Sequence, residues 1–379
     1  MASHVLRVLG PAFLLCLGLL VYLLSATDLD TRAHEEHILD DAFDTASGLG
    51  LDLGLGVDRE NGAFVMLASE SQLVDVLHTV QSLEDRFNGQ FRYPWVILND
   101  VELSTDFHHK VRTVTRAHVH FGVIPAEHWD PPEWVDQEKA AEARKIMEFG
   151  HVSDGASPRS QNAYRFFAGF LHQHSLLEPY KYAWIVDPGS EYMCSPYRDP
   201  FKTMELGGKT LGFVISSKDP DAKFATTLWQ HVSDYITAYP DLLAKDNIID
   251  FVAPVRGKTK QREYNHCSYR SSPSIIDLFF FRSPTYEAFF AHLDHTGGFY
   301  YEHWPSSSIH TLALSLFASK DATHWFEGMG YKSSLGPMGR QYCPRDDYEW
   351  EAGKCSCMPN GMQESNSCMP LWVRAARGW

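Results

Sequence analysis

The chain has 379 residues, of which 44% are hydrophobic and 13% aromatic, so it can bury a sizeable core in one large domain or two smaller ones. This composition excludes a disordered protein. The 33 basic and 48 acidic residues give a formal net charge of −15, which repels nucleic acid instead of releasing its counterions. We therefore expect no nucleic-acid partner, although a local basic patch could still hold a nucleotide diphosphate.

An apolar run from Val8 to Ala26 follows Arg7 near the start of the chain. It is close to the roughly 20 residues that a helix needs to cross a bilayer, and the preceding basic residue favours a cytoplasmic N-terminus. We interpret residues 1–26 as a cytoplasmic tip and a signal-anchor helix of type II topology. The alternative is a signal peptide that is cleaved after the small residues Ser25 and Ala26.

Residues 27–60 are acidic and then rich in Gly and Leu, which disfavours a stable helix and predicts a flexible stem. Residues 61–379 then form the lumenal domain. Six cysteines lie beyond the apolar run, and in an oxidising lumen we expect them to pair, although six cysteines allow fifteen pairings. Four of the six crowd near the C-terminus and predict a cross-linked tail. A zinc site that includes Cys355 and Cys357 is the alternative.

Buried strands and amphipathic helices alternate from Ala63 onward. Continuous apolar runs predict strands at Ala63 to Ala68, Trp95 to Leu98, Val119 to Ile124, Tyr182 to Val186, Leu211 to Ile215 and Ile276 to Phe281. Helical spacing of apolar residues predicts helices at Leu73 to Phe87 and at about 136–149, 160–174 and 224–238. This alternation indicates an α/β fold with a largely parallel central sheet flanked by helices.

In such sheets, ligands bind beyond the carboxyl ends of the strands, so the residues that follow each strand are candidates for chemistry. Asp187 ends one predicted strand, and a carboxylate there suits Mg²⁺ or Mn²⁺ shared with the phosphates of a nucleotide donor. The alternative is that Asp187 only caps a turn before Pro188. His310, at the front of an apolar helix, is a candidate nitrogen ligand or an ordinary polar residue.

Many short segments, taken in order, resemble the fungal Golgi α-1,2-mannosyltransferases, glycosyltransferase family 15. The resemblance covers roughly Asn61 to Cys368. It includes Leu98-Asn99-Asp100, Ile124-Pro125-Ala126-Glu127-His128-Trp129, Arg165-Phe166, Asp199-Pro200-Phe201, Tyr264-Asn265-His266-Cys267, Gly297-Gly298-Phe299-Tyr300-Tyr301-Glu302, His310, Trp325-Phe326, Gly330-Tyr331, Cys343-Pro344, Cys355 and Cys357.

The resemblance implies a GT-A type fold that binds a nucleotide-diphospho-sugar. It also implies a Golgi membrane protein of type II topology with a lumenal catalytic domain. The implied reaction is retaining, Mn²⁺-dependent transfer of mannose from GDP-mannose to a mannose hydroxyl of a glycoprotein glycan. By the same resemblance, Asp187 and His310 hold the metal, where Asp187 replaces a family glutamate. The residues that it implies in donor binding are Asn99, Asp100, Arg165, His266, Glu302 and Trp304.

Three positions depart from the family pattern. Ile185 replaces an arginine that precedes the metal carboxylate, Ser160 stands at the family tyrosine, and Ser274 stands at the glutamate proposed as nucleophile. A retaining transfer needs a carboxylate beside the developing cation or a front-face route assisted by the donor phosphate. We therefore hold two hypotheses: an active mannosyltransferase, or a pseudoenzyme that serves as a Golgi glycan-binding or complex-assembly subunit. Another sugar donor is a further alternative.

Overall fold

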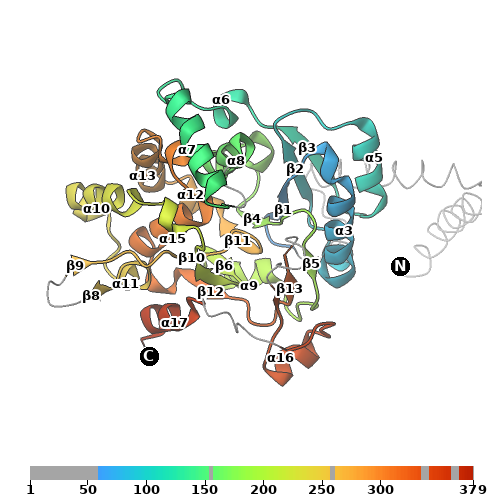
Figure 1. Ribbon diagram of the computed structural model, residues 1–379. Helices are drawn as coiled ribbons and strands as arrows, with labels where there is room; N and C mark the ends of the chain where they lie inside the picture. The colour runs from blue at the N-terminus through green and yellow to red at the C-terminus, as the bar shows by residue number, and fades with distance from the viewer. Residues whose placement is uncertain (1–58, 153–156, 257–260, 334–340, 360–366, 379) are drawn as a thin grey trace, which may run out of the picture. The chain divides into compact units, whose positions relative to one another are not determined.

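The fold is built around a central sheet in the computed structural model, which describes residues 59–152, 157–256, 261–333, 341–359 and 367–378 (Figure 1). The predicted signal anchor and most of the predicted stem, residues 1–58, lie outside these ranges. Within the described ranges, no helix is both long enough and apolar enough to cross a membrane.

Seven strands of the described chain form the central sheet, in the order β12-β6-β11-β4-β1-β2-β3. Strand β11 pairs antiparallel with both of its neighbours, and the other pairings are parallel. The largely parallel sheet that the alternation predicted is therefore confirmed. The strands are β1 (Gly62–Leu67), β2 (Trp95–Asn99), β3 (Val119–Val123), β4 (Tyr182–Ile185), β6 (Leu211–Phe213), β11 (Ser274–Asp277) and β12 (Thr323–Trp325).

The sheet is buried on both faces because alternate side chains of its strands enter two separate cores. In β1, Ala63 and Val65 join one core, whereas Phe64 and Met66 join the other. A strand whose side chains are apolar on both faces produces a continuous hydrophobic run instead of an alternating one. This is why the apolar runs located the strands well.

Helices cover both faces (Figure 1). The first core receives side chains from α8 (Pro158–Gly169), α10 (Leu228–Ala238), α11 (Ile249–Val252), α13 (Pro284–Asp294), α15 (Ser306–Phe317) and α17 (Met369–Arg377). The second receives them from α3 (Leu73–Leu83), α5 (Thr105–Thr113) and α9 (Pro200–Leu206). The remaining α-helices are α4 (Gly89–Phe91), α6 (Ala126–Trp129), α7 (Gln137–Phe149), α12 (Leu278–Phe281), α14 (Gly298–Tyr301) and α16 (Asp347–Ala352).

Short strands form smaller sheets beside the central one. They are β5 (Glu191–Tyr192) with β13 (Tyr331–Lys332) and β14 (Gln341–Tyr342), β7 (Ser216–Lys218) with β10 (Cys267–Tyr269), and β8 (Val255–Arg256) with β9 (Gln261–Arg262).

Two predicted elements need correction. The apolar run that we predicted as a strand over Ile276 to Phe281 becomes helical at Leu278, because the Asp277 side chain accepts a hydrogen bond from the Phe279 backbone N–H and caps α12. The helix predicted at 160–174 ends at Gly169 and is followed by a 3₁₀ turn over Leu171–Gln173.

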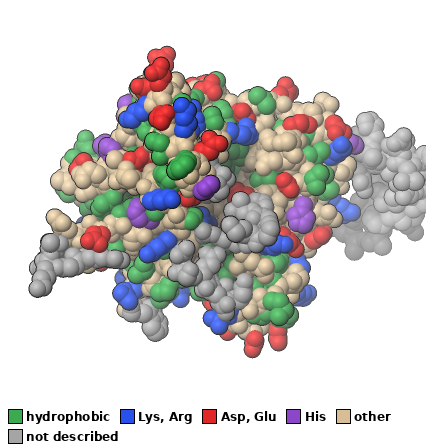
Figure 2. Space-filling model, viewed as in Figure 1, with side chains coloured by type: hydrophobic (Ala, Val, Ile, Leu, Met, Phe, Trp, Pro, Cys, Tyr) green, Lys and Arg blue, Asp and Glu red, His purple; other side chains and the backbone are tan. Residues whose placement is uncertain are grey.

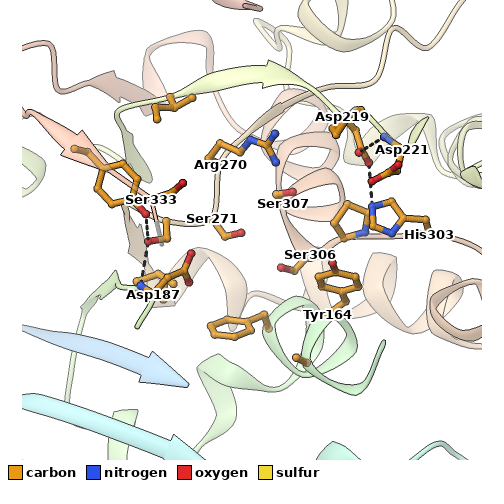
Figure 3. Close-up of a pocket in the computed structure, with 18 residues that line it drawn as sticks. Tyr164, Asp187, Asp219, Asp221, Arg270, Ser271, His303, Ser306, Ser307 and Ser333 are labelled. Carbon is orange, nitrogen blue, oxygen red and sulfur yellow. Dashed lines mark hydrogen bonds and ion pairs between the residues drawn. The ribbon is translucent and has the colours of Figure 1, made fainter. Parts of the chain in front are cut away.

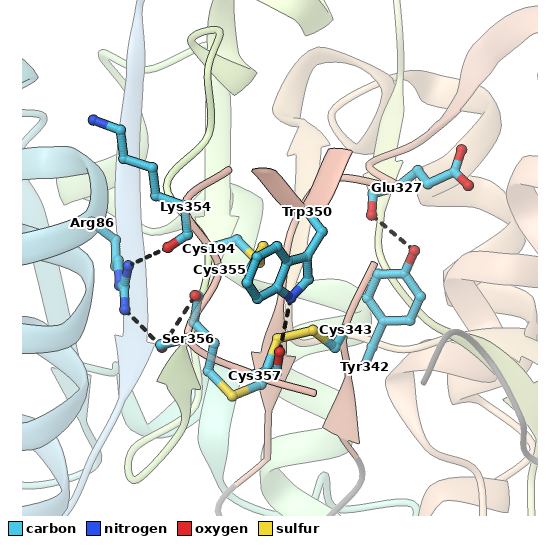
Figure 4. Close-up of a disulfide and its surroundings, with 11 residues drawn as sticks. Arg86, Cys194, Glu327, Tyr342, Cys343, Trp350, Lys354, Cys355, Ser356 and Cys357 are labelled. Carbon is cyan, nitrogen blue, oxygen red and sulfur yellow. Dashed lines mark hydrogen bonds between the residues drawn. A yellow bond between two sulfur atoms is a disulfide. The ribbon is translucent and has the colours of Figure 1, made fainter. Parts of the chain in front are cut away.

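The six cysteines beyond the apolar run are all paired. The disulfides are Cys194–Cys355, Cys267–Cys368 and Cys343–Cys357. Figure 4 shows the first and last of these beside Arg86, which donates hydrogen bonds to the Lys354 carbonyl at 3.0 Å and to Ser356 Oγ at 2.7 Å. The prediction of a cross-linked tail is confirmed, and the zinc alternative is wrong because Cys355 and Cys357 each bond to another cysteine.

Acidic, basic and hydrophobic side chains are interspersed over the face shown in Figure 2. Charges of both signs lie close together on this face although the whole chain carries a formal charge of −15. The charge that a ligand meets is therefore decided by the side chains of its own site.

Candidate active site

The direction of β11 decides which loops meet at the ligand edge of the sheet. Ser274, the first residue of β11, pairs with Ile185 near the end of β4 and with Phe213 at the end of β6. Because β11 is antiparallel, the loop before it, not the loop after it, reaches the carboxyl ends of its neighbours. This brings Ser272 beside Asp187 and places Arg270 and Ser271 in the lining of the same cavity.

A cavity of about 300 Å³ lies at this edge. Figure 3 shows its labelled polar side chains, with Asp187 and Ser271 on one side and Asp219, Asp221 and His303 on the other. The lining also includes Tyr164, Arg270, Ser272, Ser306, Ser307 and Ser333, together with apolar residues such as Phe167 and Ile215. Polar groups that converge in an otherwise partly apolar pocket are typical of a ligand site.

Asp187 lies where the sequence predicted a site residue. Its backbone N–H donates a hydrogen bond to Ser272 Oγ at 3.1 Å, and its carbonyl accepts one from Ser190 Oγ at 2.7 Å. Gly189 completes the turn with a φ of 78°, a left-handed backbone conformation that favours glycine. Asp187 therefore both begins a turn and lines the cavity, so its role in the turn does not exclude a role in the site.

Two features of the cavity favour an anionic ligand. Arg270 is the only Lys or Arg among the described lining residues, and its Nε donates a hydrogen bond to Ser217 Oγ at 3.1 Å. Ser306 and Ser307 begin the 12-residue helix α15, whose N-terminus carries the positive end of the helix dipole. The arginine that the family has at the position of Ile185 is thus absent, but Arg270 brings a guanidinium to the same cavity.

Two tyrosines, Tyr164 and Tyr331, line the cavity, but neither is at the predicted position. Ser160 is half-buried and does not line the cavity. Its hydroxyl lies 2.8 Å from Ser157 Oγ, and its backbone N–H donates a hydrogen bond to that same oxygen. Tyr164 lies one helical turn further along α8 and lines the cavity (Figure 3). Residues four apart share one face of a helix, so the tyrosine ring can reach the site from either position.

Ser274 is buried within the sheet, and its hydroxyl donates a hydrogen bond to the Ser271 carbonyl. It does not line the cavity, whereas Ser271 and Ser272 of the same loop do. The carboxylates among the described lining residues are Asp187, Asp219 and Asp221. None of them comes from the position of the family nucleophile.

His310 is 9% exposed and is absent from the cavity lining. Its Nε2 lies 3.0 Å from the Phe167 carbonyl oxygen, and its ring lies 4.6 Å from the ring of Phe281. Burial lowers the pKa of His310 to about 4, so the imidazole is neutral at neutral pH. The structure therefore does not place His310 beside Asp187 in the lining of the cavity, and its role as a metal ligand stays a prediction.

Three residues with implied roles in donor binding bond to other parts of the protein. Arg159 donates a hydrogen bond to Asn99 Oδ1 at 2.8 Å and forms an ion pair with Asp100. Arg165 is 3% exposed and forms a two-pronged ion pair with Asp294, at 2.8 and 3.0 Å. These contacts join neighbouring elements, and none of the three residues lines the cavity.

The other three implied donor residues flank cavity residues. Glu302 accepts hydrogen bonds from Thr226 Oγ1 and from Trp304 Nε1, at 2.7 and 2.9 Å, and so anchors the segment that carries His303. His266 accepts a hydrogen bond from the Asp219 N–H at 3.0 Å through its carbonyl. The structure gives these residues positioning contacts, and direct contact with the donor stays a prediction for them.

The sequence reasoning missed the cavity residues Tyr164, Asp219, Asp221, Arg270 and His303. Both Arg270 and His303 lie in segments that the motifs had identified: Arg270 is four residues before Ser274, and His303 lies between Glu302 and Trp304. The signal for Asp219 and Asp221 was two carboxylates on either side of a proline, just after a predicted strand.

Comparison with known proteins identifies the family. The family model described as glycolipid 2-alpha-mannosyltransferase matches residues 34–376. The O-glycoside alpha-1,2-mannosyltransferase homolog 2 of Schizosaccharomyces pombe is 35% identical over 318 residues, which cover 83% of this chain and 82% of the relative. Alpha-1,2 mannosyltransferase KTR1 of Saccharomyces cerevisiae is 36% identical over 302 residues, 80% of this chain and 75% of the relative.

Solved structures of similar proteins share the fold. Core-mannan synthase A (CmsA/Ktr4) from Aspergillus fumigatus, in its Mn/GDP form, superposes with a TM-score of 0.76 at 30% identity and covers 84% of this chain and 86% of its own. The mannosyltransferase Ktr4p of S. cerevisiae, in complex with GDP, gives a TM-score of 0.77 at 27% identity, with 84% and 82% covered. From the family match and these relatives together, the chain belongs to the glycolipid 2-alpha-mannosyltransferase family.

Proposed function

We propose that this protein is an active retaining α-1,2-mannosyltransferase that moves mannose from GDP-mannose to a mannose hydroxyl of a protein-linked glycan. The observation that carries the proposal is the position of Asp187. In a chain of this family, it places a carboxylate in a cavity at the carboxyl ends of parallel strands, opposite a cationic and helix-dipole surface. The resemblance assigns the same position to a metal ligand in a GT-A type fold.

The described residues of the cavity fit a nucleotide diphosphate with a divalent ion. Asp187 would hold Mn²⁺, since one or two carboxylates plus donor phosphates satisfy such an ion. A bound ion neutralises the charge that develops on the leaving diphosphate. Arg270 and the N-terminus of α15 would bind its oxygens, and Ser306 and Ser307 supply hydroxyl donors there.

Tyr164 supports catalysis rather than inactivity. Of the two tyrosines in the described lining, Tyr164 and Tyr331, Tyr164 lies on the helix that carries the family tyrosine position, and its hydroxyl can donate a hydrogen bond to the reacting sugar or phosphate. With Ser274 buried in the sheet, the route that uses the donor phosphate as base is the one that this cavity favours. The pseudoenzyme alternative rests on the departures at Ile185, Ser160 and Ser274, and the transfer assay below separates the two proposals.

We also propose a location in the Golgi membrane with the catalytic domain in the lumen. The apolar run at 8–26 supports the anchor, and the three disulfides suit an oxidising compartment. Protease protection of the described domain in sealed Golgi vesicles would test this topology.

The first test is isothermal titration of GDP into the purified full chain with and without Mn²⁺. We expect binding that needs Mn²⁺, is lost in Asp187→Asn and is kept in Asp241→Asn, which changes an exposed carboxylate outside the cavity. Transfer from GDP-mannose to methyl α-mannoside follows as the activity assay. Equal binding in wild type and Asp187→Asn, or binding without transfer to any mannoside, would refute the active-enzyme proposal.

A further inference from the structure

Asp219, Asp221 and His303 form a cluster on the side of the cavity away from Asp187 (Figure 3). One ligand atom from each lies within 4.8 Å of the others. Asp219 and Asp221 follow β7, and His303 precedes α15, so the cluster joins two segments that are far apart in the chain. We propose that these three residues hold a divalent transition-metal ion at a site separate from Asp187.

The spacing within the cluster suits a shared ion better than a direct hydrogen bond. His303 Nε2 lies 3.5 Å from Asp219 Oδ2, which is longer than the 2.7–3.2 Å of an ordinary N–H···O hydrogen bond. Two ligand atoms that each lie about 2.1 Å from one ion, at a tetrahedral angle, are about 3.4 Å apart. The observed separation therefore matches two ligands of one ion as well as it matches a long ion pair.

His303 carries the second observation. The residue is 5% exposed, and Nε2 is the ring nitrogen that faces Asp219 Oδ2. These two atoms are 3.5 Å apart, so an ion between the two groups would satisfy this buried nitrogen better than the direct contact does. Its ring packs edge-on against Tyr164, with ring centroids 5.6 Å apart, so the imidazole is held against the cavity.

The Asp219 carboxylate and the backbone of Asp221 are held in place before any ion binds. Asp219 Oδ1 accepts a hydrogen bond from the Asp221 N–H at 2.9 Å, which leaves Oδ2 directed at His303. The Phe224 N–H donates to the Asp221 carbonyl, and the His303 N–H donates to the Phe224 carbonyl, at 2.9 and 3.0 Å. These bonds tie both segments together at the cluster and reduce the ordering cost of binding.

The charge of the cavity points the same way. Its described lining holds three carboxylates, Asp187, Asp219 and Asp221, against the single guanidinium of Arg270. These carboxylates oppose the attraction that Arg270 and the N-terminus of α15 exert on an anionic ligand, and a divalent cation on Asp219 and Asp221 would remove that opposition. Two carboxylates and one imidazole form an oxygen and nitrogen set that suits Mn²⁺ and binds Zn²⁺ more tightly.

The two sites differ in what they need. Asp187 offers one carboxylate and requires donor phosphates to complete the coordination of an ion. The cluster offers three protein ligands and should bind a metal without nucleotide. Its occupancy therefore does not depend on the proposed transferase activity, and either proposal can fail alone.

The test is electron paramagnetic resonance of Mn²⁺ titrated into the purified full chain without nucleotide, with Zn²⁺ as competitor. We expect one bound Mn²⁺ per chain, at least about tenfold weaker binding in Asp219→Asn and in His303→Gln, and unchanged binding in Asp187→Asn. Thermal unfolding in chelator checks that each variant is folded. Absence of bound Mn²⁺ and Zn²⁺ in the wild type, or binding lost only in Asp187→Asn, overturns the proposal.

Discussion

Replacing Arg165 by methionine separates a structural role from a donor-binding role. Arg165 on α8 and Asp294 at the end of α13 are 3% and 6% exposed, and two hydrogen bonds join them. Arg165→Met leaves the Asp294 carboxylate buried and unpaired, which costs about 3–5 kcal/mol of unfolding free energy. For a domain of this size that corresponds to a fall in Tm of about 5–8 °C. Because Arg165 does not line the cavity, we expect the Kd for GDP to change by less than about twofold.

The double variant Arg165→Met/Asp294→Leu is the matched control. It removes both charges together, so it should recover at least about 2 kcal/mol of the loss, since apolar replacement of a whole buried pair is often neutral. Urea unfolding measures the stability of each variant, and calorimetric titration measures GDP binding. The reasoning is refuted if Arg165→Met unfolds within about 2 °C of wild type while binding GDP tenfold more weakly.

Three other predictions concern the cavity and the core. Tyr164→Phe should lower kcat by about tenfold or more, because a hydroxyl in the cavity is lost. Ser160→Ala should change kcat by less than about twofold, because Ser160 lies outside the lining. Equal effects of the two substitutions on kcat would contradict a catalytic role for Tyr164. Arg270→Met should weaken GDP binding by about 10- to 100-fold, as loss of a charged hydrogen bond does, and Arg270→Lys by less; an unchanged Kd in calorimetry would exclude a phosphate contact. Burial holds the pKa of His310 at about 4, below its ordinary 6.5, so the unfolded chain takes up the proton first as the pH falls. Lowering the pH from 7.5 to 5 should therefore reduce the free energy of unfolding, measured in urea, by about 2 kcal/mol through this one histidine. If that free energy depends on pH in His310→Gln as it does in wild type, His310 is not the cause.

The sequence predicted the fold where local chemistry decides the structure. The apolar runs at Ala63 and Trp95 became central strands because both of their faces are buried. The run from Ile276 was misread because an unbroken apolar segment has no period, and Asp277 turns it into a helix by capping. Pairing of the cysteines, with fifteen possibilities, could not be read from spacing.

The site was predicted only where one strand end decides the position of a residue, as for Asp187. Tyr164 was missed because matching motifs residue by residue cannot detect a ring that moves by one helical turn. His310 lies further along α15 than the residues that line the cavity, so the structure does not support the metal role that the resemblance implied, and that role stays a prediction. Asp219, Asp221 and His303 come together only through tertiary packing, which no local pattern records.

The disulfide between Cys267 and Cys368 has a consequence for producing the protein. Cys267 begins β10, directly before Arg270, Ser271 and Ser272, and Cys368 lies 101 residues further along at the start of α17. In the bacterial cytosol this bond would stay reduced, and the loop that forms one side of the cavity would lose its covalent anchor. Material for crystallisation or assays should therefore come from a secretory host, with the C-terminal helix kept in the expressed sequence.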